Sequence, residues 1–85
     1  MSKKIQFRPN GTCSRLIELE IDESDNIVDV KFSGGCSGNT QGISALVRGM
    51  NAREAAQRLS GIRCGFRDTS CPDQLSKAID KLLDN

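Results

Sequence analysis

The segment Gly61–Asp73 reads GIRCGFRDTSCPD and carries two of the four cysteines of this 85-residue chain, Cys64 and Cys71. It is rich in small and polar residues, and the clearest amphipathic helix pattern in the sequence follows it directly. The other two cysteines, Cys13 and Cys36, lie in similar surroundings, Gly-Thr-Cys-Ser and Gly-Gly-Cys-Ser-Gly. All four thiols are therefore expected in turns at the ends of elements, and we predict that the fold brings these turns together.

Length and composition indicate one small domain, which we place at residues 1–85. A domain of this size buries only about 60% of the surface that its unfolded chain exposes, so its core alone stabilises it weakly. With 3 Phe and no Trp or Tyr, the core must consist mainly of Ile, Leu, Val and Ala. A domain with such a core usually needs an additional stabilising crosslink, either a metal ion or disulfides.

The cysteines are expected to be reduced, because the sequence shows neither a signal peptide nor an apolar run long enough to span a membrane. This pattern indicates a cytoplasmic protein, and disulfides are rare in the cytoplasm. In that compartment four cysteines are more often metal ligands or redox groups than structural bridges. The formal net charge of +1 carries no signature of a nucleic-acid partner.

Three segments alternate apolar and polar residues with the period of two that is typical of half-buried strands. Short turns separate them, which predicts an antiparallel meander with one solvated face. The apolar positions expected to face the core are Ile5 and Phe7 in the first strand, Ile17, Leu19 and Ile21 in the second, and Val28, Val30 and Phe32 in the third.

Two helices are predicted after the strands. The first follows the glycine-rich turn 34–39, and the second is capped by Asn51 and runs to about Ser60. Gly61 suits the C-terminal stop of the second helix. The apolar stripe of the first helix is expected to contain Ile43, Leu46, Val47 and Met50.

A third helix is expected to begin at Ser70 or Cys71, with Pro72 in its first turn and Asp73 placed as in a capping box. Its spacing puts Cys71 on the buried side of the helix start. The predicted fold class is α+β, a three-stranded antiparallel sheet followed by three helices packed on one face. The apolar stripe of the third helix contains Leu75, Ala78, Ile79 and Leu82.

The absence of histidine removes the commonest general base, the Ser–His and Cys–His nucleophile pairs and every histidine metal ligand. Four thiolates around one tetrahedral ion form a closed zinc or iron site. Cys36 and Cys71 each stand where a predicted helix opens, and free N–H groups there stabilise a thiolate. The same position also suits a redox cysteine, and cysteines can simply be small buried hydrophobic residues. We predict a metal site formed by Cys13, Cys36, Cys64 and Cys71, with zinc as the first expectation and iron or an iron–sulfur cluster as the second.

A weaker candidate is an anion site formed by Gly35 and Gly38 together with Arg63 and Arg67. A glycine loop before a helix can present its backbone N–H groups to a phosphate. This loop lacks the Gly-Lys-Ser/Thr ending of a P-loop, and its glycines also suit a sharp turn from strand to helix. The arginines equally suit a solvated basic face.

The residues Thr69-Ser70-Cys71-Pro72-Asp73 spell the signature of the TSCPD domain family, which the chain resembles over nearly its whole length. Chains of this size look like the stand-alone form of the domain, and a similar domain is attached toward the C-terminus of adenosylcobalamin-dependent ribonucleotide reductases. The resemblance implies a link to ribonucleotide reduction and ribonucleotide reductase as a protein partner, although 85 residues cannot supply the barrel of that enzyme. The other similar blocks are Gly11–Ser14, Gly34–Asn39, Gln41–Ser44 and Gly61–Gly65.

The layout of Cys13, Cys36 and Cys71 also resembles, more distantly, that of iron–sulfur scaffold proteins of the NifU/IscU type. Such scaffolds carry an Asp shortly after their first cysteine, where this chain has Ser14 and Arg15, and many carry a His before their third. Cys64 is an extra thiol that can replace these ligands. A site with four thiolates is more closed than a scaffold site, which favours a structural or redox-poised role over cluster donation.

We therefore expect a cysteine-rich, metal-binding accessory or interaction domain without catalytic residues of its own. One alternative is a redox component whose Cys64 and Cys71 exchange electrons with ribonucleoside-diphosphate reductase or a similar partner. Another is a nucleotide- or phosphate-binding module at the glycine loop with Arg63 and Arg67.

Overall fold

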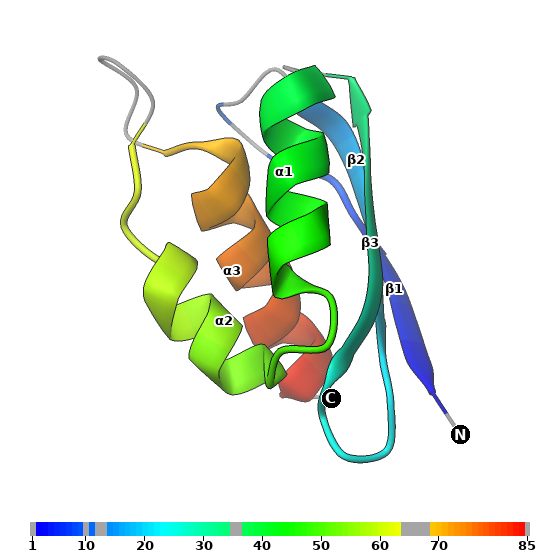
Figure 1. Ribbon diagram of the computed structural model, residues 1–85. Helices are drawn as coiled ribbons and strands as arrows, with labels where there is room; N and C mark the ends of the chain where they lie inside the picture. Colours follow the sequence, from blue (N-terminus) through cyan, green and yellow to red (C-terminus); the bar gives the residue numbers. More distant parts are fainter. Residues whose placement is uncertain (1, 10, 12–13, 35–36, 64–68, 85) are drawn as a thin grey trace.

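The computed structural model of the protein describes residues 2–9, 11, 14–34, 37–63 and 69–84. These residues form three strands followed by three helices, in the order that the sequence predicts (Figure 1). The sheet is antiparallel with strand order β1-β2-β3. The predicted α+β class is therefore confirmed. The elements are β1 (Lys3–Phe7), β2 (Ser14–Ile21), β3 (Ile27–Gly34), α1 (Ser37–Val47), α2 (Ala52–Leu59) and α3 (Cys71–Leu83).

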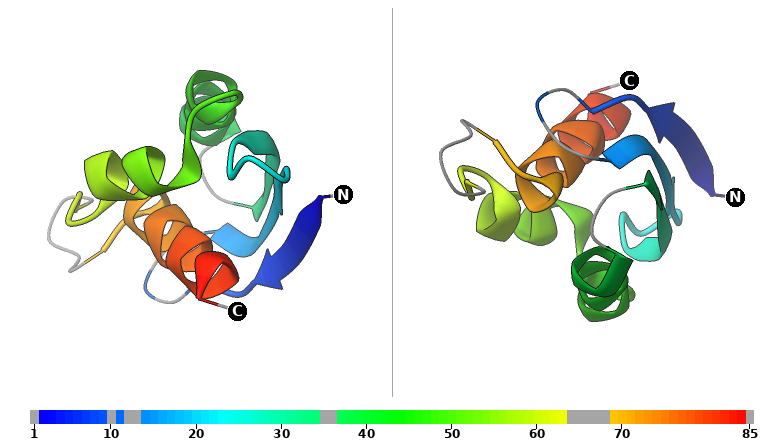
Figure 2. Two further views of the ribbon diagram at one scale, coloured as in Figure 1. Left: turned by 90° about the horizontal axis from the view of Figure 1, so that it is seen from below. Right: turned by 90° about the horizontal axis from the view of Figure 1, so that it is seen from above.

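The helices lie on one side of the sheet, as Figure 2 shows in two views. Helix α3 packs on β1 and β2, and α1 packs on β3. Helix α2 packs chiefly on α3, farther from the sheet. None of the helices in the described part of the chain covers the other face of the sheet, and the strands alternate apolar and polar residues accordingly.

The core is centred on β2 and α3, and buried residues of β3, α1 and α2 complete it. The β2 residues Ile17, Leu19 and Ile21 are buried, and Leu75 and Ile79 of α3 are buried with them. Burying one such side chain fully stabilises a fold by about 1.5–3 kcal/mol relative to leaving it exposed. The predicted inward faces of β2 and α3 are therefore confirmed.

The alternation predicted for β3 is wrong at its first residues. Glu20 pairs with Asp29, whereas Ile21 pairs with Ile27, so Val28 is an extra residue in the ladder. A β-bulge of this kind shifts the side chains on one side of it to the opposite face. As a result Ile27 is 1% exposed and Val28 is 40% exposed.

The predicted apolar stripe of α1 is also partly wrong. Leu46 is 77% exposed, while Thr40, Ser44 and Val47 form the buried face. Successive residues are about 100° apart around a helix, so the face that buries Val47 turns Leu46 to solvent. Helix α1 ends at Val47, and Met50 lies in the turn that follows it.

This turn is tied to the sheet by backbone hydrogen bonds. The N–H of Ile27 donates to the carbonyl of Met50, and the N–H of Gly49 donates to the carbonyl of Ile27, both at 2.8 Å. Asn51 then caps α2 as predicted, accepting from the N–H of Glu54 at 3.2 Å. These bonds fix the end of the domain where β3 begins.

Candidate metal site

Helix α3 begins where the sequence predicts. The Ser70 hydroxyl oxygen accepts a hydrogen bond from the N–H of Asp73 at 3.2 Å, so Ser70 is the N-cap residue. Pro72 stands in the first turn, where its missing N–H leaves no helical bond unmade. Cys71 is the first residue of the helix and is buried, with 7% of its surface exposed. Its predicted burial at the helix start is confirmed.

Asp73 fixes the segment before the helix instead of completing a capping box. Its Oδ1 accepts from the N–H of Gly61 at 2.8 Å, and its Oδ2 accepts from the hydroxyl of Thr69 at 2.5 Å. Asp73 is only 6% exposed. Because these donors stabilise the carboxylate, they lower the pKa of Asp73. The Thr69 bond contributes most and the Gly61 bond next; burial opposes the shift, and the charge of Lys77 adds to it.

Two serine hydroxyls make further bonds around the same turn. Besides its capping role, Ser70 donates through its hydroxyl to the carbonyl of Ile62 at 2.6 Å. Ser76 donates to the carbonyl of Asp73 at 2.6 Å within the helix. Gly61 and Ile62, which follow α2, are thus both hydrogen-bonded to the start of α3.

The turn between β1 and β2 reaches the same place through Gly11. A Cβ atom on Gly11 would lie 2.9 Å from the Cγ2 methyl carbon of Thr69, closer than real Cβ contacts come. Gly11 also has φ +76°, which favours glycine. The Thr69 hydroxyl oxygen accepts from the side-chain amide of Gln74 at 2.9 Å. Sequence reasoning did not find these roles of Thr69 and Gly11, because the contact joins residues far apart in the chain.

The described neighbours of the cysteines lie at one end of the domain. Ser14 at the start of β2 pairs with Gly34 at the end of β3. Gly11 contacts Thr69, and Ile62 is bonded to Ser70. In Figure 1 this end also holds the first turn of α1, in darker green, and the orange start of α3.

Of the four predicted ligands, the structure describes Cys71. Cys13, Cys36 and Cys64 lie outside the described residues, so the four-cysteine site stays a prediction. Within the described ranges, no three His, Cys, Asp or Glu side chains gather closely enough to hold a metal ion.

Of the four residues of the predicted anion site, Gly35 and Arg67 lie outside the described residues. Gly38 lies in the first turn of α1, and Arg63 is exposed. No hydrogen bond or ion pair described for Arg63 joins it to the glycine turn, so the anion site also stays a prediction.

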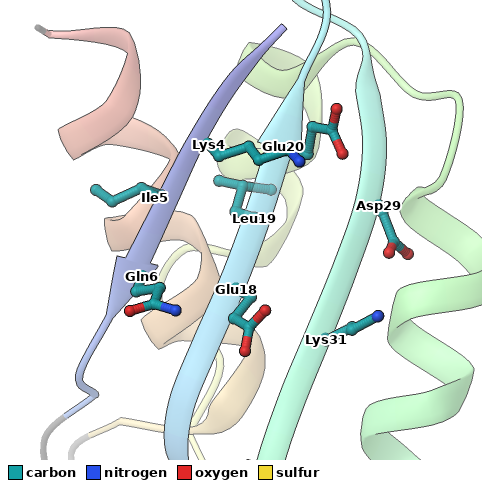
Figure 3. A pocket seen from close by; sticks show the side chains of 8 residues that line it. All are labelled: Lys4, Ile5, Gln6, Glu18, Leu19, Glu20, Asp29 and Lys31. Carbon is teal, nitrogen blue, oxygen red and sulfur yellow. The ribbon is translucent and has the colours of Figure 1, made fainter.

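A hollow of about 380 Å³ lies on the helix-free face of the sheet (Figure 3). Lys4, Glu18 and Lys31 point outward from three different strands, in line with the period of two. Lys4 stands opposite Glu20, and Glu18 stands opposite Lys31. These pairs describe a solvated face with balanced charges, and the hollow is separated from the start of α3 by the sheet. Its lining residues are Lys4, Ile5, Gln6, Glu18, Leu19, Glu20, Asp29 and Lys31.

The elements and their order define a small α+β domain with a buried cysteine at the start of its last helix. The sequence model of the TSCPD domain family matches residues 2–83, so the chain belongs to the TSCPD domain family. No curated protein and no solved structure matches the chain. The likeness to scaffold proteins of the NifU/IscU type is therefore not confirmed. Among the described residues, no helix is long and apolar enough to cross a membrane.

Proposed function

We propose that this TSCPD domain binds one metal ion through Cys13, Cys36, Cys64 and Cys71. Zinc is the first candidate, and iron or an iron–sulfur cluster is the second. The domain then serves as a small accessory or interaction module, linked through its family to ribonucleotide reduction. A closed four-thiolate metal supplies a crosslink between distant parts of the chain.

The observation that carries this proposal is the set of contacts between residues next to the cysteines. Ser14 follows Cys13 and pairs with Gly34, which stands two residues before Cys36. Ile62 stands two residues before Cys64 and is bonded to Ser70, next to Cys71. Because consecutive Cα atoms are about 3.8 Å apart, these contacts limit the distance between Cys13 and Cys36 and between Cys64 and Cys71. The contact of Gly11 with Thr69 links the two pairs.

The chemistry of the donors fits the same group. Thiolates are the soft ligands that zinc and iron–sulfur clusters take in closed sites. Cys71, one of these donors, is the first residue of α3. Its burial also supports a ligand role over thiol exchange with a partner, since exchange requires that the sulfur be reached.

Metal analysis of the purified protein and its variants tests the proposal. We expect about one zinc per chain and no colour, and a brown protein with a visible absorption band would assign the iron–sulfur form. Serine at any one of the four cysteine positions should reduce the metal content and the melting temperature together, because metal binding is coupled to folding in small domains.

A matched control is Ala78→Ser, which places a hydroxyl in the core while leaving every thiol in place. It should lower the melting temperature without lowering the metal content. A protein that takes up no metal when supplied with zinc under reducing conditions contradicts the proposal. Loss of thiol exchange activity only in the variants of Cys64 and Cys71, with unchanged stability, would favour the redox alternative.

A further inference from the structure

Thr69 joins segments that are distant in the sequence. Its methyl group lies so close to Gly11 that a Cβ atom at position 11 would clash with it. Its hydroxyl donates to the carboxylate of Asp73 at 2.5 Å and accepts from Gln74 at 2.9 Å. Thr69 is itself buried. One small side chain therefore contacts both the turn before β2 and the first turn of α3.

The hydroxyl bonds of Thr69 determine where its methyl group points. A β-branched side chain has few χ1 rotamers, and the bonds to Asp73 and Gln74 hold the hydroxyl on the helix side. The methyl group is then directed at Gly11. Through the second oxygen of Asp73, the same arrangement holds the N–H of Gly61.

We propose that Thr69 is the positioning residue of the metal site, setting the turn at Gly11 and the segment at Gly61 against the start of α3 at Cys71. This inference rests on the proposed function, and it assigns Thr69 no contact with the metal. It explains why Gly11 and Thr69 must match in shape. A poor fit between these two residues should therefore lower the affinity for the metal. The same backbone strain placed elsewhere in the fold should lower stability without lowering that affinity.

Substitutions at Gly11 distinguish a positioning role of Thr69 from a general effect of backbone strain. Gly11→Ala adds the strain of φ +76° and the clash with the Thr69 methyl group. Gly49→Ala is the matched control, because Gly49 has φ +87° but nothing within 4 Å of an added Cβ. Gly49 also lies in the turn after α1, at the other end of the domain. The double variant Gly11→Ala with Thr69→Ser removes the methyl group from the clash and keeps the hydroxyl.

The measurement is zinc affinity by competition with a chromophoric chelator, together with the melting temperature of each zinc-loaded protein. We expect Gly11→Ala to weaken zinc binding roughly tenfold or more, the range typical of residues that support metal ligands. Gly49→Ala should lower the melting temperature and leave the affinity unchanged. Adding Thr69→Ser to Gly11→Ala should restore more than half of the lost affinity on a logarithmic scale.

If Gly11→Ala and Gly49→Ala both bind zinc as tightly as the wild type, Thr69 has no positioning role, although the metal site itself stands. Failure of Thr69→Ser to rescue Gly11→Ala overturns the positioning role as well. If Gly11→Ala does not fold, Thr69→Val provides the second test, since it keeps a methyl group and removes the hydroxyl that orients it. Thr69→Val must then weaken zinc binding relative to Thr69→Ser. A wild-type protein that binds no zinc overturns the proposed function, and the positioning role with it.

Discussion

Four of the five residues in the segment Thr69–Asp73 hold the start of α3 in place. Ser70 caps the helix, Pro72 fixes the backbone of its first turn, and Thr69 and Asp73 bond to each other and to neighbouring segments. None of these roles requires a thiol. Cys71, the remaining residue of the segment, is buried as the first residue of the helix, and its assignment as a ligand stays a prediction.

The lowered pKa of Asp73 predicts a specific dependence of stability on pH. A carboxylate with a depressed pKa in the folded state stabilises the fold above its unfolded pKa of about 3.8. That stability is lost as the pH falls through the lower, folded pKa. Asp73→Asn should thus destabilise the protein at pH 7 by about 1.5–3 kcal/mol, the range for hydrogen bonds to a charged group. The difference from wild type should shrink at strongly acid pH.

Urea unfolding of wild type and Asp73→Asn at a series of pH values, with EDTA in every sample, measures this effect. Asp80→Asn is the control, because it removes the same charge from an exposed position on the same helix. It should change stability by less than about 0.5 kcal/mol at neutral pH. A stability gap for Asp73→Asn that stays constant down to strongly acid pH would show that the ionised carboxylate is not what holds Gly61 and Thr69.

Local interactions were predictable from the sequence, whereas contacts between distant residues were not. The caps at Asn51 and Ser70 each bond to an N–H three residues further along, so short motifs reveal them. The bond from Gly61 to Asp73 and the contact of Gly11 with Thr69 depend on how separate elements meet. No local pattern encodes them, although the glycines marked where the backbone needs unusual freedom.

The first residues of β3 show how a sheet departs from a simple alternation. The bulge at Val28 places Ile27 in the core. A strict period of two had predicted Val28 at that position instead. The regular alternation of the partner strand β2 gives no sign of where the extra residue lies. The alternation over β2 is regular from Ile17 to Ile21, and there the prediction was correct.

Alanine substitutions on either side of the bulge test this register. Ile27→Ala should destabilise the protein by about 2–5 kcal/mol, because it opens a cavity in the core. Val28→Ala should cost less than about 1 kcal/mol, since that side chain is 40% exposed. Urea unfolding curves of the two variants provide the comparison. A larger loss for Val28→Ala than for Ile27→Ala would mean that the register without a bulge is the correct one.

The two ends of the domain are held together in different ways. Where β3 begins, backbone bonds join Ile27 to Gly49 and Met50, and Asp25 accepts from the N–H of Ala52. At the opposite end, the side chains of Asp73 and Ser70 bond to Gly61 and Ile62, and Thr69 contacts Gly11. The neighbours of all four cysteines lie at this second end. A metal bound there would add a crosslink beside these side-chain contacts.

The overall architecture followed from hydrophobic periodicity, because strands and helices expose one face each and must cover the other. The candidate site followed from thiol chemistry and from the family that the chain belongs to. Periodicity alone could not indicate how the turns meet, because this depends on the packing of α3 across β1 and β2. The described neighbours of the cysteines lie at one end of the domain, and the convergence of the four thiols stays a prediction.

X-ray absorption spectroscopy at the zinc edge tests the four-cysteine site most directly. The zinc-loaded wild-type protein should show four sulfur neighbours at about 2.3 Å and no nitrogen or oxygen in the first shell. The Cys71→Ser variant serves as the internal comparison and should show one sulfur fewer. A first shell of nitrogen and oxygen atoms, or one that Cys71→Ser leaves unchanged, would contradict the assignment of Cys13, Cys36, Cys64 and Cys71 as the ligands.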